Sequence, residues 1–174
     1  MAQVEAQFQA EEQAQEKGVL LKQGTVRYGP YGSSSPQNFD WQLLHGERFI
    51  RVSIRHGWIV DAIGFRARRP DGGNRDVHFG GNGGNQSHID LRPSEIVLGF
   101  SGKSAYSIGA NQVVIAQIYV HTNERTLGPY GSATDVTNVT DFYSPIRVDR
   151  PLVGVFGRCG RYLESVGVIL RLNN

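Results

Sequence analysis

The sequence predicts an all-β domain in which three similar antiparallel sheets surround a pseudo-threefold axis. Three observations support this fold class. Apolar and polar residues alternate in short segments, as they do in half-buried strands. The 22 glycines that punctuate these segments have no three-residue period, so they indicate many turns and exclude a collagen-like chain. Two sequence motifs also recur three times along the chain.

The predicted strands follow one another from Val19 onward, and no helical apolar pattern of useful length occurs after residue 18. The clearest are residues 49–55, with Ile50, Val52 and Ile54 on one face; 62–67, with Ile63, Phe65 and Ala67 on one face; 113–120, a nearly continuous β-branched run; and 166–172, in which Val166, Val168, Leu170 and Leu172 alternate with other residues. Short strands with glycine-rich connections are typical of all-β domains.

The first recurring motif is Gly-Pro-Tyr-Gly at residues 29–32, which returns at 128–131, with the glycine-rich segment 80–84 between them. The starting positions 29, 80 and 128 are 51 and 48 residues apart. The second motif has the form G-x-x-x-Z-[AS]-[IV]-G, in which Z is Asp61, Tyr106 or Glu164. Two independent motifs with a similar spacing predict three repeated sheets.

The start of the chain differs in composition from the rest. We expect residues 1–18 to form a polar N-terminal extension and residues 19–174 to form one domain. Residues 1–17 are rich in Gln, Glu and Ala, and Val4 and Phe8 are spaced for one face of a helix. Two interpretations remain open: a short helix that docks or forms oligomers, and a frayed tail, because so short a helix is marginal alone.

Composition and charge restrict the function. The net charge is +2, and the three arginines of residues 66–69 are followed closely by Asp71 and Asp76, which favours a solvated loop of mixed charge over a nucleic-acid surface. The single cysteine, Cys159, excludes an intrachain disulfide. Because no signal peptide and no long apolar stretch occurs, we expect a cytoplasmic or nucleocytoplasmic protein without membrane insertion.

Catalytic and metal-binding motifs are missing from the sequence. Residues 102–104 read Gly-Lys-Ser, but Val97 stands where a phosphate-binding loop needs its first glycine. No G-x-S-x-G motif occurs, and the five histidines lack metal-ligand spacing with each other or with the cysteine. Pairs of Asp and Glu are so common that the sequence does not exclude a glycosidase pair, but nothing in it selects one. We therefore expect no enzyme activity, no catalytic residue, no metal and no cofactor.

The G-x-x-x-Z motif predicts a tight turn with binding chemistry. Its glycine permits a backbone conformation that other residues resist, its next residues direct N–H groups outward, and an acidic residue closes the turn. The result is a shallow cup of N–H donors with one carboxylate, which matches the vicinal hydroxyls of a sugar. A hairpin turn whose acid serves only its own backbone is the alternative for a single copy. The threefold repetition favours the sugar site.

Residues from about 23 to 172 resemble a jacalin-related lectin. The matching segments are Gly29–Gly32 with Phe39 and Asp40, Gly57–Phe65, Gly80–Gly84, Ile96–Gly99, Thr126–Gly131 and Val155–Glu164. The resemblance implies a β-prism I fold of three four-stranded, Greek-key-like antiparallel sheets that binds sugars without a metal. The galactose-binding branch has a chain cleaved to expose a glycine, whereas 28 residues precede Gly29 here, so the mannose-binding branch is the better match.

By this resemblance, the main carbohydrate site uses one turn and one glycine loop. The turn contributes Gly57, the N–H groups of Trp58 and Ile59, and the Asp61 carboxylate, and the loop contributes Gly83 and the N–H of Gly84. The Trp58 ring is expected to provide an apolar wall for a second sugar unit.

A second site is expected to be weaker or lost. It would use Gly160, Arg161, Tyr162 and Glu164, with the loop at residues 32–36. Glu164 replaces the expected Asp, and Pro36 falls where a glycine N–H would meet the sugar but has no N–H to donate. The third copy of the motif, with Tyr106 in place of the acid, is expected to be structural.

The expected partners are glycans or glycoproteins that contain mannose or glucose, and the resemblance implies a homodimer or a homotetramer. The alternative is a β-prism scaffold that no longer binds sugar and acts as a module for protein interaction or oligomerisation. The altered second site and the N-terminal extension favour that alternative, and binding to immobilised mannose separates the two.

Overall fold

The computed structural model describes residues 24–172, and these residues form twelve strands and no helix. The predicted domain starts at residue 19, so its first residues, like the predicted extension of residues 1–18 with Val4 and Phe8, lie outside the described part of the chain. No described residue belongs to a helix long and apolar enough to cross a membrane.

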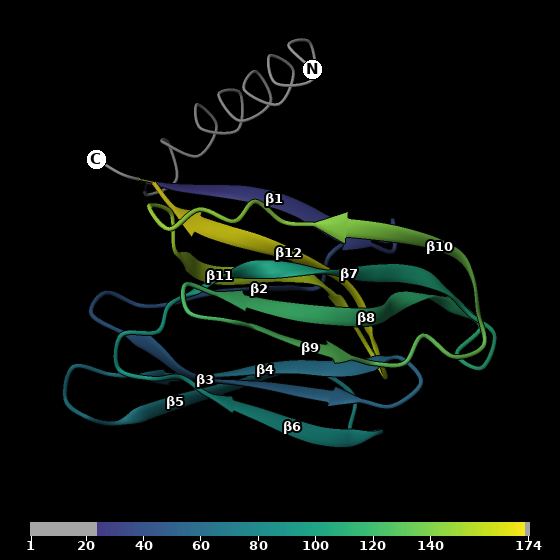
Figure 1. Cartoon of the computed structure of the whole chain (residues 1–174), viewed down its shortest axis with the longest axis horizontal. Coiled ribbons are helices and arrows are strands. Elements are labelled where there is room, and N and C mark those ends of the chain that lie inside the picture. The colour runs from purple at the N-terminus through teal and green to yellow at the C-terminus, as the bar shows by residue number, and fades with distance from the viewer. Residues whose placement is uncertain (1–23, 173–174) are drawn as a thin grey trace, which may run out of the picture.

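The twelve strands form three four-stranded antiparallel sheets, as the sequence predicted (Figure 1). The first sheet has the order β1-β12-β11-β2, with β1 Thr25–Gly32, β12 Leu163–Arg171, β11 Leu152–Cys159 and β2 Phe39–Gln42. The second has the order β5-β4-β3-β6, with β5 Asn74–Gly80, β4 Val60–Arg68, β3 Arg48–His56 and β6 Asn85–Asp90. The third has the order β10-β7-β8-β9, with β10 Val136–Tyr143, β7 Val97–Ser107, β8 Gln112–Thr122 and β9 Thr126–Tyr130.

Each sheet repeats one plan around the pseudo-threefold axis. Two consecutive strands form a central hairpin, namely β3–β4, β7–β8 or β11–β12, and an earlier or later strand pair flanks it on both sides. Each flanking strand pair is joined by a short loop that follows the first repeated motif: residues 33–38 connect β1 to β2, 81–84 connect β5 to β6, and 131–135 connect β9 to β10.

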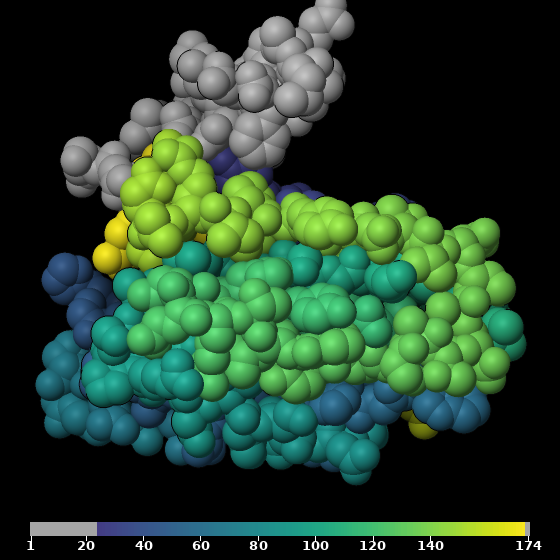
Figure 2. Space-filling view, viewed as in Figure 1, coloured from purple at the N-terminus to yellow at the C-terminus, as the bar shows by residue number. Residues whose placement is uncertain are grey.

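The core lies where the inner faces of the three sheets meet. Each sheet contributes large side chains with almost no exposure, among them Ile54, Ile63, Phe100, Ile115, Ile118 and Leu163. Figure 2 shows one side of the prism, where residues of β8, β9 and β10 form the surface. This shared core makes the three sheets one folding unit.

The predicted alternation of β12 is only half correct. Val166, Val168 and Leu170 lie in the central core, but Ile169 on the opposite face is also buried, because it packs with Val153 and Phe156 in a second small cluster. The Arg27 guanidinium lies 5.2 Å from the centre of the Phe156 ring, so part of this cluster is covered by a cation stacked on an aromatic face.

The predicted third copy of the G-x-x-x-Z turn is wrong. Residues 102–106 lie inside β7, and the hairpin turn follows at residues 108–111. The position equivalent to Asp61 is Ala116. A Cβ built on Gly131 would lie 2.5 Å from the Ala116 carbonyl oxygen, as one built on Gly80 would lie 2.2 Å from the carbonyl oxygen of Asp61. The β7–β8 hairpin is longer than the other two. The sequence motif therefore matched residues inside β7 and not those of the turn.

Candidate carbohydrate site

The first candidate site is built on the turn between β3 and β4. The carbonyl oxygens of Gly57 and Trp58 accept hydrogen bonds from the N–H groups of Ser132 (2.9 Å) and Thr134 (3.1 Å) in the neighbouring loop. In contrast, the N–H groups of Trp58 and Ile59 donate no hydrogen bond to any residue between 24 and 172. The neighbouring loop therefore fixes the turn by its acceptors and leaves its donors available.

The backbone conformation at position 57 does not require a glycine. Its φ is not positive, and a Cβ built on it would meet only the Gly84 Cα, at 3.9 Å. The expectation that Gly57 supplies a conformation closed to other residues is therefore wrong. Its missing side chain instead leaves space between the turn and the glycine loop.

The glycine loop is the strained partner of this turn. Gly80 and Gly84 have φ values of +130° and +67°, which side chains with a Cβ rarely adopt. The Arg55 guanidinium holds the loop by donating to the carbonyl oxygens of Gly83 (2.9 Å) and Gly84 (3.1 Å). As in the turn, the backbone carbonyl oxygens of the loop already accept hydrogen bonds. The N–H groups of Gly83 and Gly84, in contrast, donate no hydrogen bond within the described chain.

Asp61 lies between the turn and the loop and is only 8% exposed. A Cβ on Gly83 or Gly84 would come within 2.7 Å of one of its carboxylate oxygens, so a side chain at Gly83 would displace that carboxylate, and one at Gly84 would also meet the His56 carbonyl oxygen at 2.5 Å. Burial raises the pKa of the Asp61 carboxyl, and the charges of Arg55 and His56 oppose that shift. No hydrogen bond from the described residues reaches this carboxylate, which therefore remains an available acceptor.

His56, the last residue of β3, borders the site directly before the turn. Its Nε2 lies 2.7 Å from the Ser87 hydroxyl, and its ring packs edge-on against Tyr130. Burial lowers the pKa of His56, while the nearby charge of Asp61 raises it. Trp58 contrasts with these buried groups, because 62% of it is exposed next to the open side of the turn.

The second candidate site has the same frame but a different carboxylate environment. Glu164 is 8% exposed, and its Oε1 lies 3.4 Å from the Nε of Arg158. Arg158 also donates to the Pro36 carbonyl oxygen at 2.9 Å, just as Arg55 donates to the glycine loop. This geometry places Pro36 where the first site has its glycines, and Glu164 already has an ion-pair partner. The turn residues Arg161 and Tyr162 again use no N–H group in a bond to the described chain.

The two candidate sites touch. A Cβ built on Gly81, in the glycine loop of the first site, would lie 2.1 Å from the Arg161 carbonyl oxygen in the turn of the second. All the predicted site residues therefore gather at one end of the prism in two groups: Gly57, Trp58, Ile59, Asp61, Gly83 and Gly84 in one, and Gly160, Arg161, Tyr162 and Glu164 in the other.

Sequence reasoning missed the arginine that organises each site. Arg55 and Arg158 each stand two residues before the glycine of the turn, so the repeat reads R-x-G-x-x-x-[DE] in both copies. That extra match was visible in the sequence and would have identified both side chains. Among residues 24–172, no group of three or more His, Cys, Asp or Glu side chains is arranged to hold a metal ion.

Comparison with known proteins gives consistent results. The model of the family described as "Jacalin-like lectin domain" matches residues 28–169. The chain is 32% identical over 145 residues to Jacalin-related lectin 19 of Arabidopsis thaliana, which covers 82% of this chain and 78% of that protein. A mannose/glucose-specific lectin of Parkia platycephala is 26% identical over 164 residues, covering 88% of this chain and 34% of that longer protein.

Solved structures share the fold. The Calystegia sepium agglutinin superposes with a TM-score of 0.73 at 23% identity, covering 85% of this chain and 97% of that one. A mannose-binding jacalin-related lectin of Ananas comosus superposes with a TM-score of 0.70 at 26% identity, covering 86% and 99%.

Proposed function

Because this chain belongs to the jacalin-like lectin family and is thus a carbohydrate-binding protein, we propose that it binds mannose or glucose units of glycans at the turn of residues 57–61. Asp61 and three N–H groups form the site. The carboxylate accepts hydrogen bonds from two neighbouring sugar hydroxyls, and the N–H groups of Trp58, Ile59 and Gly84 donate to sugar oxygens.

The observation that carries this proposal is the set of unused polar groups around Asp61. The Asp61 side chain is largely buried, but its carboxylate oxygens are not among the fully enclosed, unpartnered polar atoms of the described residues, so they can accept hydrogen bonds from a ligand. Several backbone donors beside it are also without partners in the described chain. A ligand that is rich in vicinal hydroxyls satisfies both at once. The exposure of the Trp58 ring supports the proposal that it contacts a second sugar unit.

The second turn is proposed as the poorer site. Arg158 competes with a sugar for the Glu164 carboxylate, and Pro36 offers no N–H group. The loss of one hydrogen bond to a charged group costs about 1.5–3 kcal/mol, which is roughly a 10- to 100-fold loss in affinity.

Isothermal titration with methyl α-mannoside tests the assignment. The Asp61→Asn variant is expected to lose at least about 10-fold in affinity, whereas Glu164→Gln, the matched change in the other turn, is expected to stay within about 2-fold of the unchanged protein. A larger loss in Glu164→Gln than in Asp61→Asn would reverse the assignment. Failure of the unchanged protein to bind immobilised mannose would favour the scaffold alternative.

A single shallow sugar site binds weakly, because few atoms are buried. Several sites on one particle raise the avidity without any new contact. The homodimer or homotetramer expected from the family resemblance would supply such valency, and it stays a prediction, as does the cytoplasmic location.

A further inference from the structure

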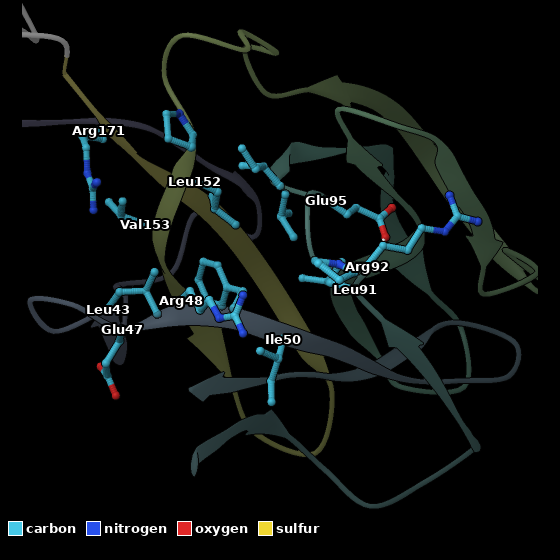
Figure 3. A pocket seen from close by; sticks show the side chains of 15 residues that line it. Leu43, Glu47, Arg48, Ile50, Leu91, Arg92, Glu95, Leu152, Val153 and Arg171 are labelled. Atoms are coloured by element: carbon cyan, nitrogen blue, oxygen red, sulfur yellow. The ribbon is translucent and has the colours of Figure 1, made fainter. Parts of the chain in front are cut away.

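A hollow of about 310 Å³ opens at the end of the prism opposite the glycine loops (Figure 3). It lies there because β3, β7 and β11 all begin around it and run away from it toward the turns at the other end. Its apolar lining includes Leu43, Phe49, Ile50, Leu91, Leu152 and Val153. Its volume is at the lower limit of small-molecule sites, about 300 Å³, and suits a few side chains better than a folded partner.

The rim of this hollow carries positive charge. Its two acids are already paired, Glu47 with Arg75 at 2.6 Å and Glu95 with Arg125 at 2.7 Å. Three exposed arginines complete the rim: Arg48, Arg92 and Arg171. Arg92 lies 4.0 Å from Glu124, and the side chains of Arg48 and Arg171 make no hydrogen bond or ion pair with any residue from 24 to 172. An occupant with apolar side chains and nearby acids would complement both features.

The described chain begins beside this hollow. Gly24 accepts a hydrogen bond from the Leu172 N–H at 2.9 Å, which fixes its position at the end of the first sheet. Gly24 also lines a smaller adjoining hollow, which shares Leu43, Val153 and Arg171 with the larger one. Gly24, where the upstream chain joins the described domain, therefore lies at the edge of the apolar lining.

The sequence before Gly24 has the composition that the hollow requires. Val19, Leu20 and Leu21 are three consecutive apolar residues, flanked by Lys17 and Lys22. Four acids, Glu5, Glu11, Glu12 and Glu16, stand further upstream and outnumber the two lysines, so residues 1–23 carry a net charge of −2. Three residues of extended chain span roughly 10 Å, so the link from Leu21 to Gly24 is short. A short tether gives the segment an effective concentration in the millimolar range at its own hollow, which favours its own chain over a second copy.

We propose that Val19, Leu20 and Leu21 fold back into this hollow of their own chain, with the acidic residues upstream lying over its arginine rim. The segment covers the half-buried side chains of Leu43, Ile50 and Leu91 and removes its own three apolar side chains from water. The contact lies at the far end from the sugar site, so it stabilises the domain and leaves sugar binding unchanged.

Methyl NMR on the full chain tests the contact directly. Nuclear Overhauser effects are expected between the methyl groups of Val19, Leu20 and Leu21 and those of Leu43, Leu91 and Leu152. In a sample that mixes labelled and unlabelled protein, these effects are expected only within one chain. Absence of the effects, or their appearance only between chains, would overturn the proposal.

Paired variants test its energetic consequence. The double variant Leu20→Ser/Leu21→Ser is expected to lower Tm by about 5 °C and to increase binding of a hydrophobic dye. The control Val4→Ser/Phe8→Ser changes two apolar residues of the same N-terminal segment and is expected to leave Tm unchanged. Equal changes in Tm for both pairs of substitutions would contradict the proposal. A separate titration with decanoate, which should fill the apolar hollow, is expected to shift the Leu20 and Leu21 methyl signals, and binding of decanoate without such a shift would also contradict it. Mannoside titration of the first pair confirms that the domain remains folded.

Discussion

At the residue scale, Gly84 sets the shape of the proposed sugar site. Its φ of +67° and the 2.5 Å separation between a built Cβ and the His56 carbonyl oxygen exclude a side chain without movement of the loop. We expect Gly84→Ala to weaken mannoside binding by at least about 10-fold, because the displaced loop misplaces an N–H donor. Titration calorimetry measures it.

Gly109→Ala is the matched control for this substitution. Gly109 lies in the β7–β8 turn, its φ is not positive, and a built Cβ would meet nothing within 4 Å. Binding and Tm of Gly109→Ala should equal those of the unchanged protein. Equal affinity in both variants would mean that the glycine loop does not contribute to the site.

The charged Asp61 carboxylate is expected to lower the stability of the folded protein when no sugar is bound. Burial raises its pKa above the usual range, so the charged form is disfavoured in the folded protein. The cost is present above the folded pKa and disappears as the pH falls through it. At neutral pH, Asp61→Asn should therefore raise Tm by about 2–4 °C while mannoside binding is lost.

Differential scanning fluorimetry across a pH series checks this pair of effects. The gain in Tm of Asp61→Asn should shrink in acid, where the carboxyl of the unchanged protein becomes protonated. A lower Tm at neutral pH would show that the carboxylate has a stabilising partner within the protein.

At the scale of elements, the connection that leads into β3 and the one that leads into β7 are each capped by a buried glutamate. Glu47 accepts from the Leu44 N–H at 2.7 Å, and Glu95 accepts from the Arg92 N–H at 3.1 Å. Each carboxylate also pairs with an arginine from another strand or loop. The caps hold the ends of the central hairpins in place around the hollow.

Glu95 makes this cap sensitive to acid. Hydrogen bonds from Arg125, together with those from Thr122 and the Arg92 backbone, lower its pKa to about 2. The stabilisation is complete above the ordinary pKa of 4.5 and is lost as the pH falls from there toward about 2. Glu95→Gln should cost about 2 kcal/mol at neutral pH, less than a fully buried pair because Arg125 is 30% exposed.

Chemical denaturation at several pH values measures this cost. The difference between Glu95→Gln and the unchanged protein should vanish near the folded pKa. Asp90→Asn serves as the control, because Asp90 is 69% exposed in its pair with Arg51 and should change stability by less than about 1 kcal/mol. An equal cost for both variants would contradict the special role of the cap.

The elements also show where sequence reasoning succeeded and where it stopped. Alternation located β3, β4 and β12, and a β-branched run located β8, each to within a few residues, because these strands contribute a face to the shared core. The third turn was misplaced onto Gly102–Tyr106, because the motif could not reveal that the β7–β8 hairpin is longer and that Ala116 takes the position of the acid. Side-chain pairs between distant segments, such as Arg158 with the Pro36 carbonyl, have no local signature in the sequence.

At the scale of the whole molecule, the spacing of the repeated motifs predicted three sheets. One unit of about 50 residues has too little core to fold alone, so the three sheets must pack together. The residues of all three sheets meet in one cluster around Ile54, Phe100 and Leu163. Unfolding is therefore expected to be a single transition. At a mannoside concentration of 100 times Kd, the whole transition should move up by roughly 5–10 °C, because binding adds about 2.7 kcal/mol.

Calorimetry with and without mannoside tests this cooperativity. The calorimetric and van't Hoff enthalpies should agree, and at the same mannoside concentration Asp61→Asn should shift by about half as much or less. Two transitions, of which only one responds to mannoside, would mean that the sheet with residues 57–61 unfolds separately from the others.

The bond between the Leu172 N–H and the Gly24 carbonyl places both ends of the described chain at the base of the prism, away from the glycine loops. A protein immobilised through either end on a biosensor chip would present the proposed sugar-binding face to the flowing sample. Copies joined in tandem through these ends would likewise keep every glycan-recognition face unobstructed, so valency can be engineered by gene fusion without redesigning the fold.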